Sequence, residues 1–133
     1  MAFNSDSEAK EHFWTTVANR ALEIPFCAAC KTFFWYPRPF CPTCWSDAVE
    51  FRASTGMGTI WTYTIVRFAH GAQNVWQEKV PYVVALVTLD ERVRIMGNVI
   101  GCDVDSIRSG QRVRLTYHEV GDRTLPAFLV EGP

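Results

Sequence analysis

The sequence predicts a mostly β protein with three consecutive parts: an N-terminal helix, a four-cysteine metal-binding ribbon and a five-stranded OB-fold barrel. Three observations support this prediction. Apolar residues recur at helical spacing before residue 23, two Cys-x-x-Cys pairs follow, and strand-like apolar runs fill the chain from residue 55 onward. We therefore expect the parts to occupy residues 1–22, 23–54 and 55–133.

The first part combines a helix start signal with an amphipathic pattern. Ser5, followed three residues later by Glu8, fits a capping box. Helical spacing then places one apolar stripe at Phe13, Trp14, Val17, Ala18, Ala21 and Leu22. We expect a helix over residues 5–22 whose apolar face covers the barrel or docks on another chain.

The second part contains two closely spaced pairs of thiols, Cys27 with Cys30 and Cys41 with Cys44, separated by ten residues. A short hairpin of that length can bring four sulfurs around one tetrahedral ion. Four thiolates form a closed shell, which is typical of a structural zinc site, whereas catalytic zinc keeps a position open for water. We predict zinc here, and iron would fit the same four-cysteine cage.

Two further features of the cysteines bear on this prediction. Two disulfides are the competing interpretation, but they need an oxidising compartment, and the chain shows a fifth, odd Cys102 and no secretory signal. We expect a reducing cytoplasm instead. Many zinc-binding knuckles place glycine after the second cysteine, where the backbone often needs a positive φ. Lys31 and Trp45 occupy these positions here, which leaves the knuckle geometry open.

The segment between the two pairs is rich in rings. Residues 31–40 include five aromatic side chains, and two prolines there exclude a helix. A ribbon this small cannot bury all five rings internally. They either pack the ribbon onto the barrel or form a contact surface for a partner protein or an acyl ligand.

The remaining chain has the pattern of a small barrel. A helical turn is expected within residues 103–110, and strands are expected at residues 59–68, 82–89, 92–99, 112–118 and 126–130. Residues 67–81 form a connection that is long for a hairpin, and this connection contains His70 and Trp76. Long connections with large side chains often carry function.

Composition narrows the function classes. The net charge is −1, from 13 basic and 14 acidic side chains, which does not resemble the basic footprint of a duplex-binding domain. No apolar run approaches the ~18 residues of a membrane span. Aromatic residues reach 14%, more than a core of this size needs, so some should line a groove or an interface.

The combined motifs resemble one known family. They are Cys-Ala-Ala-Cys, Tyr-Pro-Arg-Pro-Phe-Cys-Pro-Thr-Cys, Gly-Thr-Ile-Trp-Thr-Tyr-Thr, Val-Pro-Tyr-Val-Val-Ala-Leu-Val and Met-Gly-Asn-Val. Together they resemble domain of unknown function thirty-five, a rubredoxin-like zinc ribbon fused to an OB-fold. The resemblance covers residues 10–131 and carries over the four cysteines as metal ligands.

The resemblance implies a function as well as a fold. Members of this family look like accessory subunits of thiolase-fold enzymes that process acyl-CoA: thiolases, acyltransferases, and retro-aldolases of steroid or aromatic-acid side chains. In such hetero-oligomers the catalytic residues lie on the partner, while the small subunit stabilises it and helps form the acyl-CoA channel. The resemblance therefore implies that the chain has no activity alone. The net charge of −1 and the absence of Lys-rich loops count against a role in binding nucleic acid.

The residues themselves agree with a non-catalytic role. No His, Ser or Cys outside the four-cysteine cage has a neighbour at the spacing of a nucleophile and its base. An adjacent carboxylate, Asp103, should raise the pKa of the Cys102 thiol and make it a poor nucleophile. Arg92 and Arg94 alternate with core residues, as do Arg112 and Arg114, so we expect each pair to share one strand face.

Contacts with the partner or with acyl-CoA are expected from six residues: Trp35, Tyr36, His70, Trp76, Arg92 and Arg94. Two other function classes stay open. The barrel could bind single-stranded nucleic acid through aromatic side chains such as Trp61 and Tyr63. Iron in the four-cysteine cage could instead make the protein a rubredoxin-like electron carrier.

Overall fold

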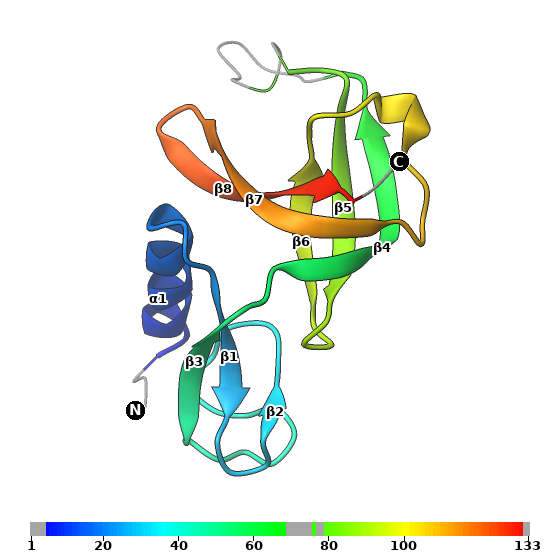
Figure 1. Cartoon of the computed structure of the whole chain (residues 1–133). Coiled ribbons are helices and arrows are strands. Elements are labelled where there is room, and N and C mark those ends of the chain that lie inside the picture. Colours follow the sequence, from blue (N-terminus) through cyan, green and yellow to red (C-terminus); the bar gives the residue numbers. More distant parts are fainter. Residues whose placement is uncertain (1–4, 69–75, 77–78, 132–133) are drawn as a thin grey trace. The chain divides into compact units, whose positions relative to one another are not determined.

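The computed structural model describes residues 5–68, 76 and 79–131, and the chain divides into two compact units (Figure 1). The first, here called the ribbon unit, comprises the residues up to Thr55 together with Glu91–Val93. The second, the barrel unit, comprises Gly56–Asp90 and the residues from Arg94 onward. His70, one of the predicted contact residues, lies outside the described residues.

The ribbon unit begins with helix α1, Asp6–Ala18. The Ser5 side chain accepts a hydrogen bond of 3.2 Å from the backbone N–H of Glu8, which confirms the predicted helix start. The predicted end at residue 22 is wrong. Arg20 adopts a left-handed conformation with φ of 57°, which terminates the helix although the apolar spacing continues to Leu22.

The helix is followed by a small antiparallel sheet in the order β2-β1-β3. Its strands are β1 (Glu23–Cys27), β2 (Thr32–Phe33) and β3 (Val49–Ala53). Phe26 of β1 pairs with Phe33, and Cys27 pairs with both Thr32 and Val49. The sheet therefore fixes the first ligand cysteine at the end of its central strand.

The ribbon unit has a buried cluster around its cysteines, formed by Ala9, Cys27, Phe34, Cys41 and Val49. Other buried apolar side chains of this unit are Phe13, Val17, Leu22, Ile24 and Phe26. Two residues of the cluster are predicted metal ligands, so the predicted metal site is part of the apolar core of this unit.

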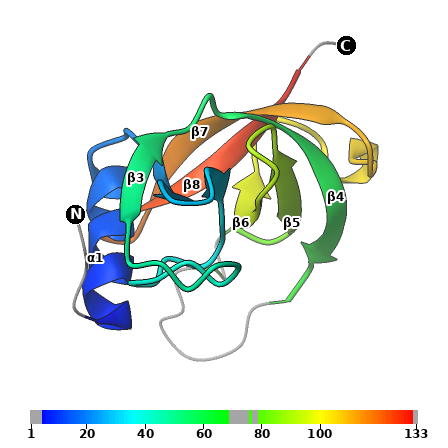
Figure 2. The same cartoon turned by 90° about the horizontal axis from the view of Figure 1, so that it is seen from below.

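The barrel unit confirms the predicted five-stranded OB-fold. Its strands are β4 (Met57–Val66), β5 (Tyr82–Leu89), β6 (Arg94–Val99), β7 (Arg112–Val120) and β8 (Arg123–Val130). They close in the order β4-β5-β6-β8-β7. Every pair is antiparallel except β6 with β8, and Figure 2 shows β4 curving around the barrel beside β7. A short 3₁₀ helix, η2 (Val104–Ser106), lies between β6 and β7.

The barrel is filled by alternate side chains of its strands. Buried residues on the five strands include Ile60, Val83, Val87, Leu89, Ile95, Val113 and Phe128, and Ile107, directly after η2, is buried as well. Strand β8 starts three residues earlier than predicted, because Gly121 takes a φ of 63° and turns the chain tightly out of β7. Among the described residues, no helix has the length and hydropathy needed to cross a membrane.

Candidate metal centre

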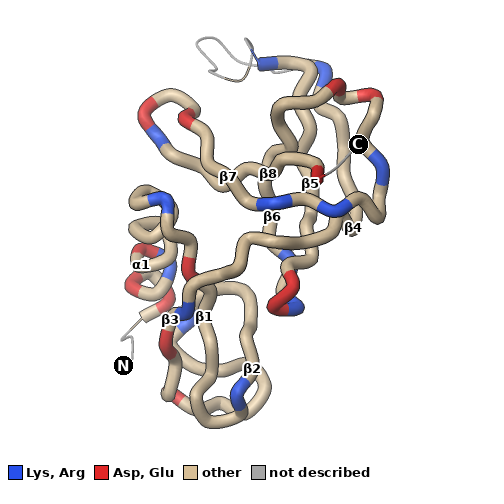
Figure 3. The backbone as a smooth tube through the Cα atoms, in the orientation of Figure 1, with Lys and Arg blue, Asp and Glu red and all other residues tan. Residues whose placement is uncertain are grey.

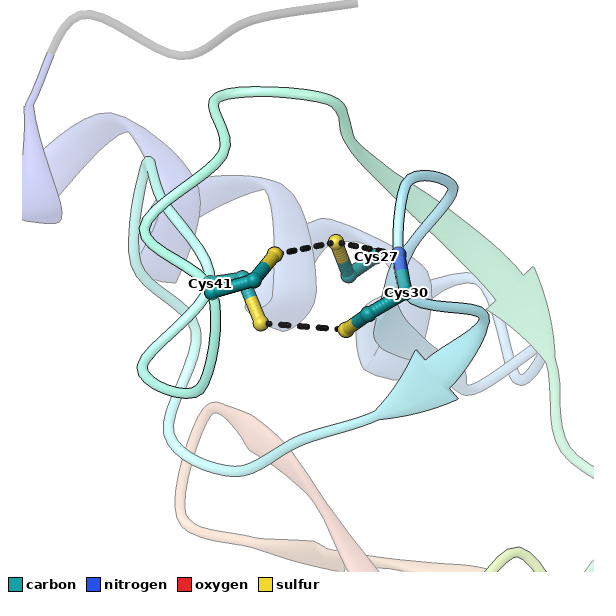
Figure 4. A group of neighbouring side chains, drawn as sticks. Cys27, Cys30 and Cys41 are labelled. Atoms are coloured by element: carbon teal, nitrogen blue, oxygen red, sulfur yellow. Dashed lines mark hydrogen bonds between the residues drawn. The ribbon is translucent and has the colours of Figure 1, made fainter.

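The four predicted ligands come together in the ribbon unit. Their sulfur atoms all lie within 4.8 Å of one another. The Sγ atoms of Cys27 and Cys44 are 3.5 Å apart, and those of Cys30 and Cys41 are 3.6 Å apart. Tetrahedral Zn–S bonds of ~2.3 Å require sulfur atoms roughly 3.8 Å apart, so the spacing fits one metal ion. In Figure 4 the side chains of Cys27 and Cys30 point toward that of Cys41.

The two knuckles, residues 27–31 and 41–45, have the same backbone design. The N–H of Lys31 donates to the carbonyl of Cys27 at 2.8 Å, and the N–H of Trp45 donates to that of Cys41 at 2.9 Å. Lys31 and Trp45 have φ angles of 59° and 64°. Each knuckle thus has the left-handed residue that glycine usually supplies, although neither contains glycine there.

Backbone amides also act on the sulfurs. The N–H of Thr43 donates to Cys41 Sγ at 3.3 Å, and the N–H of Cys30 donates to Cys27 Sγ at 3.5 Å. Burial opposes ionisation of Cys41, but amides from Cys44 and Thr43 outweigh it and lower the pKa of Cys41 to about 6. The N–H of Cys30 is the main cause that lowers the pKa of Cys27.

Cys44 shows the opposite behaviour. The N–H of Ser46 favours its thiolate, but the neighbouring sulfurs, first that of Cys27, raise the pKa of Cys44 to about 11. Four sulfurs this close compete for charge, and a cation removes the competition because all four can then ionise. The donor set is closed and all-sulfur, which suits zinc or iron. The four cysteines are therefore positioned for metal binding.

The predicted aromatic contacts lie in different environments. Trp35 is half-buried, with its ring centroid 4.8 Å from that of Phe13, whereas its neighbour Tyr36 is 60% exposed. Trp76 is also half-buried, and its ring lies 4.7 Å from the ring of Tyr82.

The expectation that Arg92 and Arg94 share one strand face is wrong. Arg92 lies in a turn before β6, with a φ of 72°, and belongs to the ribbon unit. This turn is tied to that unit because the Glu91 carboxylate accepts hydrogen bonds from Ser54 and Thr55. Arg94 alone lies on the strand, and its guanidinium stacks 3.9 Å from the centroid of the Trp61 ring.

Two other arginines are paired with carboxylates. Arg112 makes a bidentate contact with Asp90 at 2.8 and 3.0 Å, and Arg114 lies 3.2 Å from Glu131. The hydrogen bonds from Arg112 lower the pKa of Asp90. These arginines therefore already have anionic partners within the barrel unit.

Of the residues weighed for catalysis, His12 lies on α1, Cys102 follows β6 and His118 lies on β7. His12 Nε2 lies 3.3 Å from Glu23, and burial lowers the pKa of His118, whose Nε2 has no hydrogen-bond partner among the described residues. Desolvation and then the charge of Asp103 raise the pKa of Cys102, in the direction expected from the sequence.

The sequence analysis missed one exposed aromatic pair. The rings of Phe40 and Trp45 stack with centroids 5.2 Å apart and an interplanar angle of 27°. Phe40 directly precedes Cys41 and Trp45 directly follows Cys44. The sequence could have predicted this pair. A knuckle that brings Cys41 and Cys44 together also brings together the two residues that flank them, Phe40 and Trp45.

The fold and the site define a rubredoxin-like metal ribbon joined to an OB-fold barrel. Two family models match the chain: the rubredoxin-like zinc ribbon domain of ChsH2 at residues 17–50 and the C-terminal OB-fold domain of ChsH2 at residues 51–118. The chain belongs to this ChsH2 family, also called DUF35.

Known relatives include subunits of larger enzymes. The chain is 39% identical over 118 residues to a probable enoyl-CoA hydratase alpha subunit of Thermomonospora curvata, covering 87% of this chain and 36% of that one. It is 32% identical over 127 residues to the 3-oxo-4,17-pregnadiene-20-carboxyl-CoA hydratase alpha subunit of Mycobacterium tuberculosis, covering 93% and 38%. The chain thus spans less than two fifths of either relative.

A solved structure is similar over almost the whole chain. It is a chain of the Ltp2-ChsH2(DUF35) aldolase, with 32% sequence identity and a TM-score of 0.82. The match covers 93% of this chain and 95% of that one.

Proposed function

We propose that this protein is a non-catalytic accessory subunit of an acyl-CoA-processing complex and binds a catalytic partner of the thiolase fold. The observation that carries the proposal is the match to the Ltp2-ChsH2(DUF35) aldolase, which covers 93% of the chain. The hydratase alpha subunits it resembles are named for coenzyme A thioesters, which supports a substrate of that class. The thiolase fold of the partner rests on the family resemblance seen in the sequence motifs.

The arrangement of reactive groups supports a division of labour. Four of the five cysteines form the metal cage, and the pKa of Cys102 is raised, which disfavours its thiolate. The His12 imidazole contacts the Glu23 carboxylate, with Nε2 at 3.3 Å from Oε1. In our proposal the partner supplies the nucleophile and the acid–base groups, while this chain stabilises the partner and forms part of the acyl-CoA channel.

We assign zinc to the four-cysteine cage, with a structural role. A closed four-thiolate shell leaves no position for water or substrate, so the ion holds the ribbon fold rather than performing chemistry. All five cysteines are free thiols, which suits a reducing cytoplasm. Iron in the same cage would indicate the electron-carrier alternative, and elemental analysis of the purified protein separates the two.

Binding of single-stranded nucleic acid is less well supported. Such sites need a basic groove lined by stacking rings. Figure 3 shows acidic and basic positions interspersed along the barrel, and Arg112 and Arg114 are paired with Asp90 and Glu131.

The proposal is tested by purifying the untagged protein from its native host and identifying what co-elutes by mass spectrometry. We expect a thiolase-fold protein, a complex that turns over an acyl-CoA ester, and no turnover by this chain alone. Turnover by the isolated chain, or elution without any such protein, would contradict the proposal.

A further inference from the structure

We infer that the stacked pair Phe40 and Trp45, on the second knuckle, is the anchor through which this chain docks into an apolar, uncharged pocket of its catalytic partner. The inference rests on the proposed function and adds to it the docking residues and the chemistry of the surface they fit. Four features of the described residues support it: exposure, backbone conformation, rigidity and the lack of charge.

Both stacked rings are exposed, although other large rings, among them Phe68 at 78% and Tyr36 at 60%, are exposed as well. Trp45 is 71% exposed and Phe40 is 36% exposed. Trp61 is also exposed, at 51%, but the guanidinium of Arg94 covers one of its faces at 3.9 Å. Trp35 and Trp76, predicted as contacts from the sequence, are half-buried against Phe13 and Tyr82. A large exposed ring lowers solubility on a free protein but is typical of an interface centre.

The backbone conformation at Trp45 is unfavourable for a residue with a large side chain. Its φ of 64° is a left-handed conformation that glycine adopts without steric cost. Lys31, at the matching position of the first knuckle, has the same left-handed conformation with a φ of 59°. Its exposed ammonium is readily hydrated, whereas the exposed indole of Trp45 is not. A bulky apolar residue in such a conformation indicates a function that requires the side chain.

The pair is also held rigidly. The N–H of Trp45 donates to the Cys41 carbonyl at 2.9 Å, and the N–H of Cys41 donates to the Ser46 carbonyl at 2.9 Å. Two metal-ligand cysteines lie between the two rings in sequence. Binding a partner therefore costs little extra ordering, which is the advantage of a preorganised anchor. The metal site thus gains a role in function, because it holds the docking rings in place.

The chemistry around the pair defines the complementary surface. Residues 39–46 contain no acidic or basic side chain. An uncharged aromatic anchor is best matched by an apolar pocket without buried charges, as in the centre of subunit interfaces. This segment has no charged side chain that could pair with a charged or polyanionic partner.

The two knuckles provide a matched test. Trp45→Gly removes the ring and relieves the left-handed backbone, and Lys31→Gly makes the same backbone change without removing a ring. Both variants should keep one metal ion per chain and melt at the wild-type temperature or slightly above it. Affinity for the recombinant partner identified by co-elution should fall about thirtyfold or more in Trp45→Gly and stay unchanged in Lys31→Gly.

A second variant, Phe40→Ala, removes the other ring without touching the left-handed position and should also weaken binding. Wild-type affinity in both ring variants would overturn the inference and leave the proposed function intact. Loss of metal or early melting in Trp45→Gly would assign the ring a structural role and also overturn it. If the wild type binds no partner, the proposed function fails as well. If the wild type forms a dimer that Trp45→Gly abolishes, the pair joins two copies of this chain, and the inference is wrong.

Discussion

The ribbon unit and the barrel unit achieve a stable core in different ways. One buried cluster of the ribbon unit has five residues, and two of them, Cys27 and Cys41, belong to the four cysteines that are positioned for metal binding. The barrel closes five strands on themselves and fills the interior with aliphatic side chains and Phe128. Other buried apolar side chains of the ribbon unit include Phe13, Val17, Leu22, Ile24 and Phe26. The cysteine-containing cluster, however, brings four sulfurs together, and we propose that a metal ion stabilises that part of the unit. Among the described residues, no such cluster of metal-binding side chains lies in the barrel unit.

This contrast extends to function. In our proposal, an ion in the ribbon stabilises the fold and also orders the exposed rings beside it, so that stability and docking would depend on the same site. In the barrel, the stabilising groups are buried, and the exposed arginines are largely engaged with carboxylates and with Trp61.

The largest effect should come from removing one metal ligand. Cys41→Ser should release the ion and unfold the ribbon unit, because apparent binding energies of structural zinc reach roughly 10 kcal/mol or more. The barrel should stay folded. Metal content and two-dimensional NMR spectra check this, with Cys102→Ser, an exposed thiol outside the cage, as the control. A Cys41→Ser protein that stays folded and keeps its metal would contradict the claim that the ribbon unit, unlike the barrel unit, depends on the ion.

A cavity in the barrel should produce the reverse pattern. Phe128 is fully buried, so Phe128→Ala should cost about 3–5 kcal/mol through lost burial and the cavity left behind. Chemical denaturation measures the loss, and metal content should remain at the wild-type value. Release of metal by this variant would show that the two units do not fold independently.

Much of this contrast was accessible from the sequence. The repeated Cys-x-x-Cys spacing predicted the four-sulfur cluster, and the apolar runs predicted the strands of the barrel. Periodicity did not predict the end of α1, since Ala21 and Leu22 continue the apolar pattern beyond the left-handed Arg20. Arg92 was misplaced for a similar reason, because alternation cannot reveal where a strand begins.

Long-range pairing explains the other gaps. Strands β1 and β3 pair Glu23 with Ala53, thirty residues away, and no local pattern announces that contact. The pair Phe40 and Trp45 depends on closure of the knuckle, and its exposure depends on which rings the helix covers. The knuckle spacing could have predicted the pair, whereas its exposure emerges only from the folded chain.

A smaller effect should come from the helix start in the ribbon unit. Ser5→Ala removes the acceptor for the Glu8 N–H and should cost about 1 kcal/mol. Ser7→Ala, at an exposed position within the same helix, is the matched control. Thermal melting of the metal-loaded protein should resolve the difference, and equal melting of the two variants would show that the cap does not stabilise this unit.

The most direct test of the metal-organised ribbon is residue-resolved hydrogen exchange before and after chelation under reducing conditions. We predict that removal of the ion abolishes protection at the amides of β1, β2, β3 and both knuckles, while β4–β8 keep theirs. Unchanged protection in the ribbon would contradict this account, and so would an equal loss of protection in the barrel.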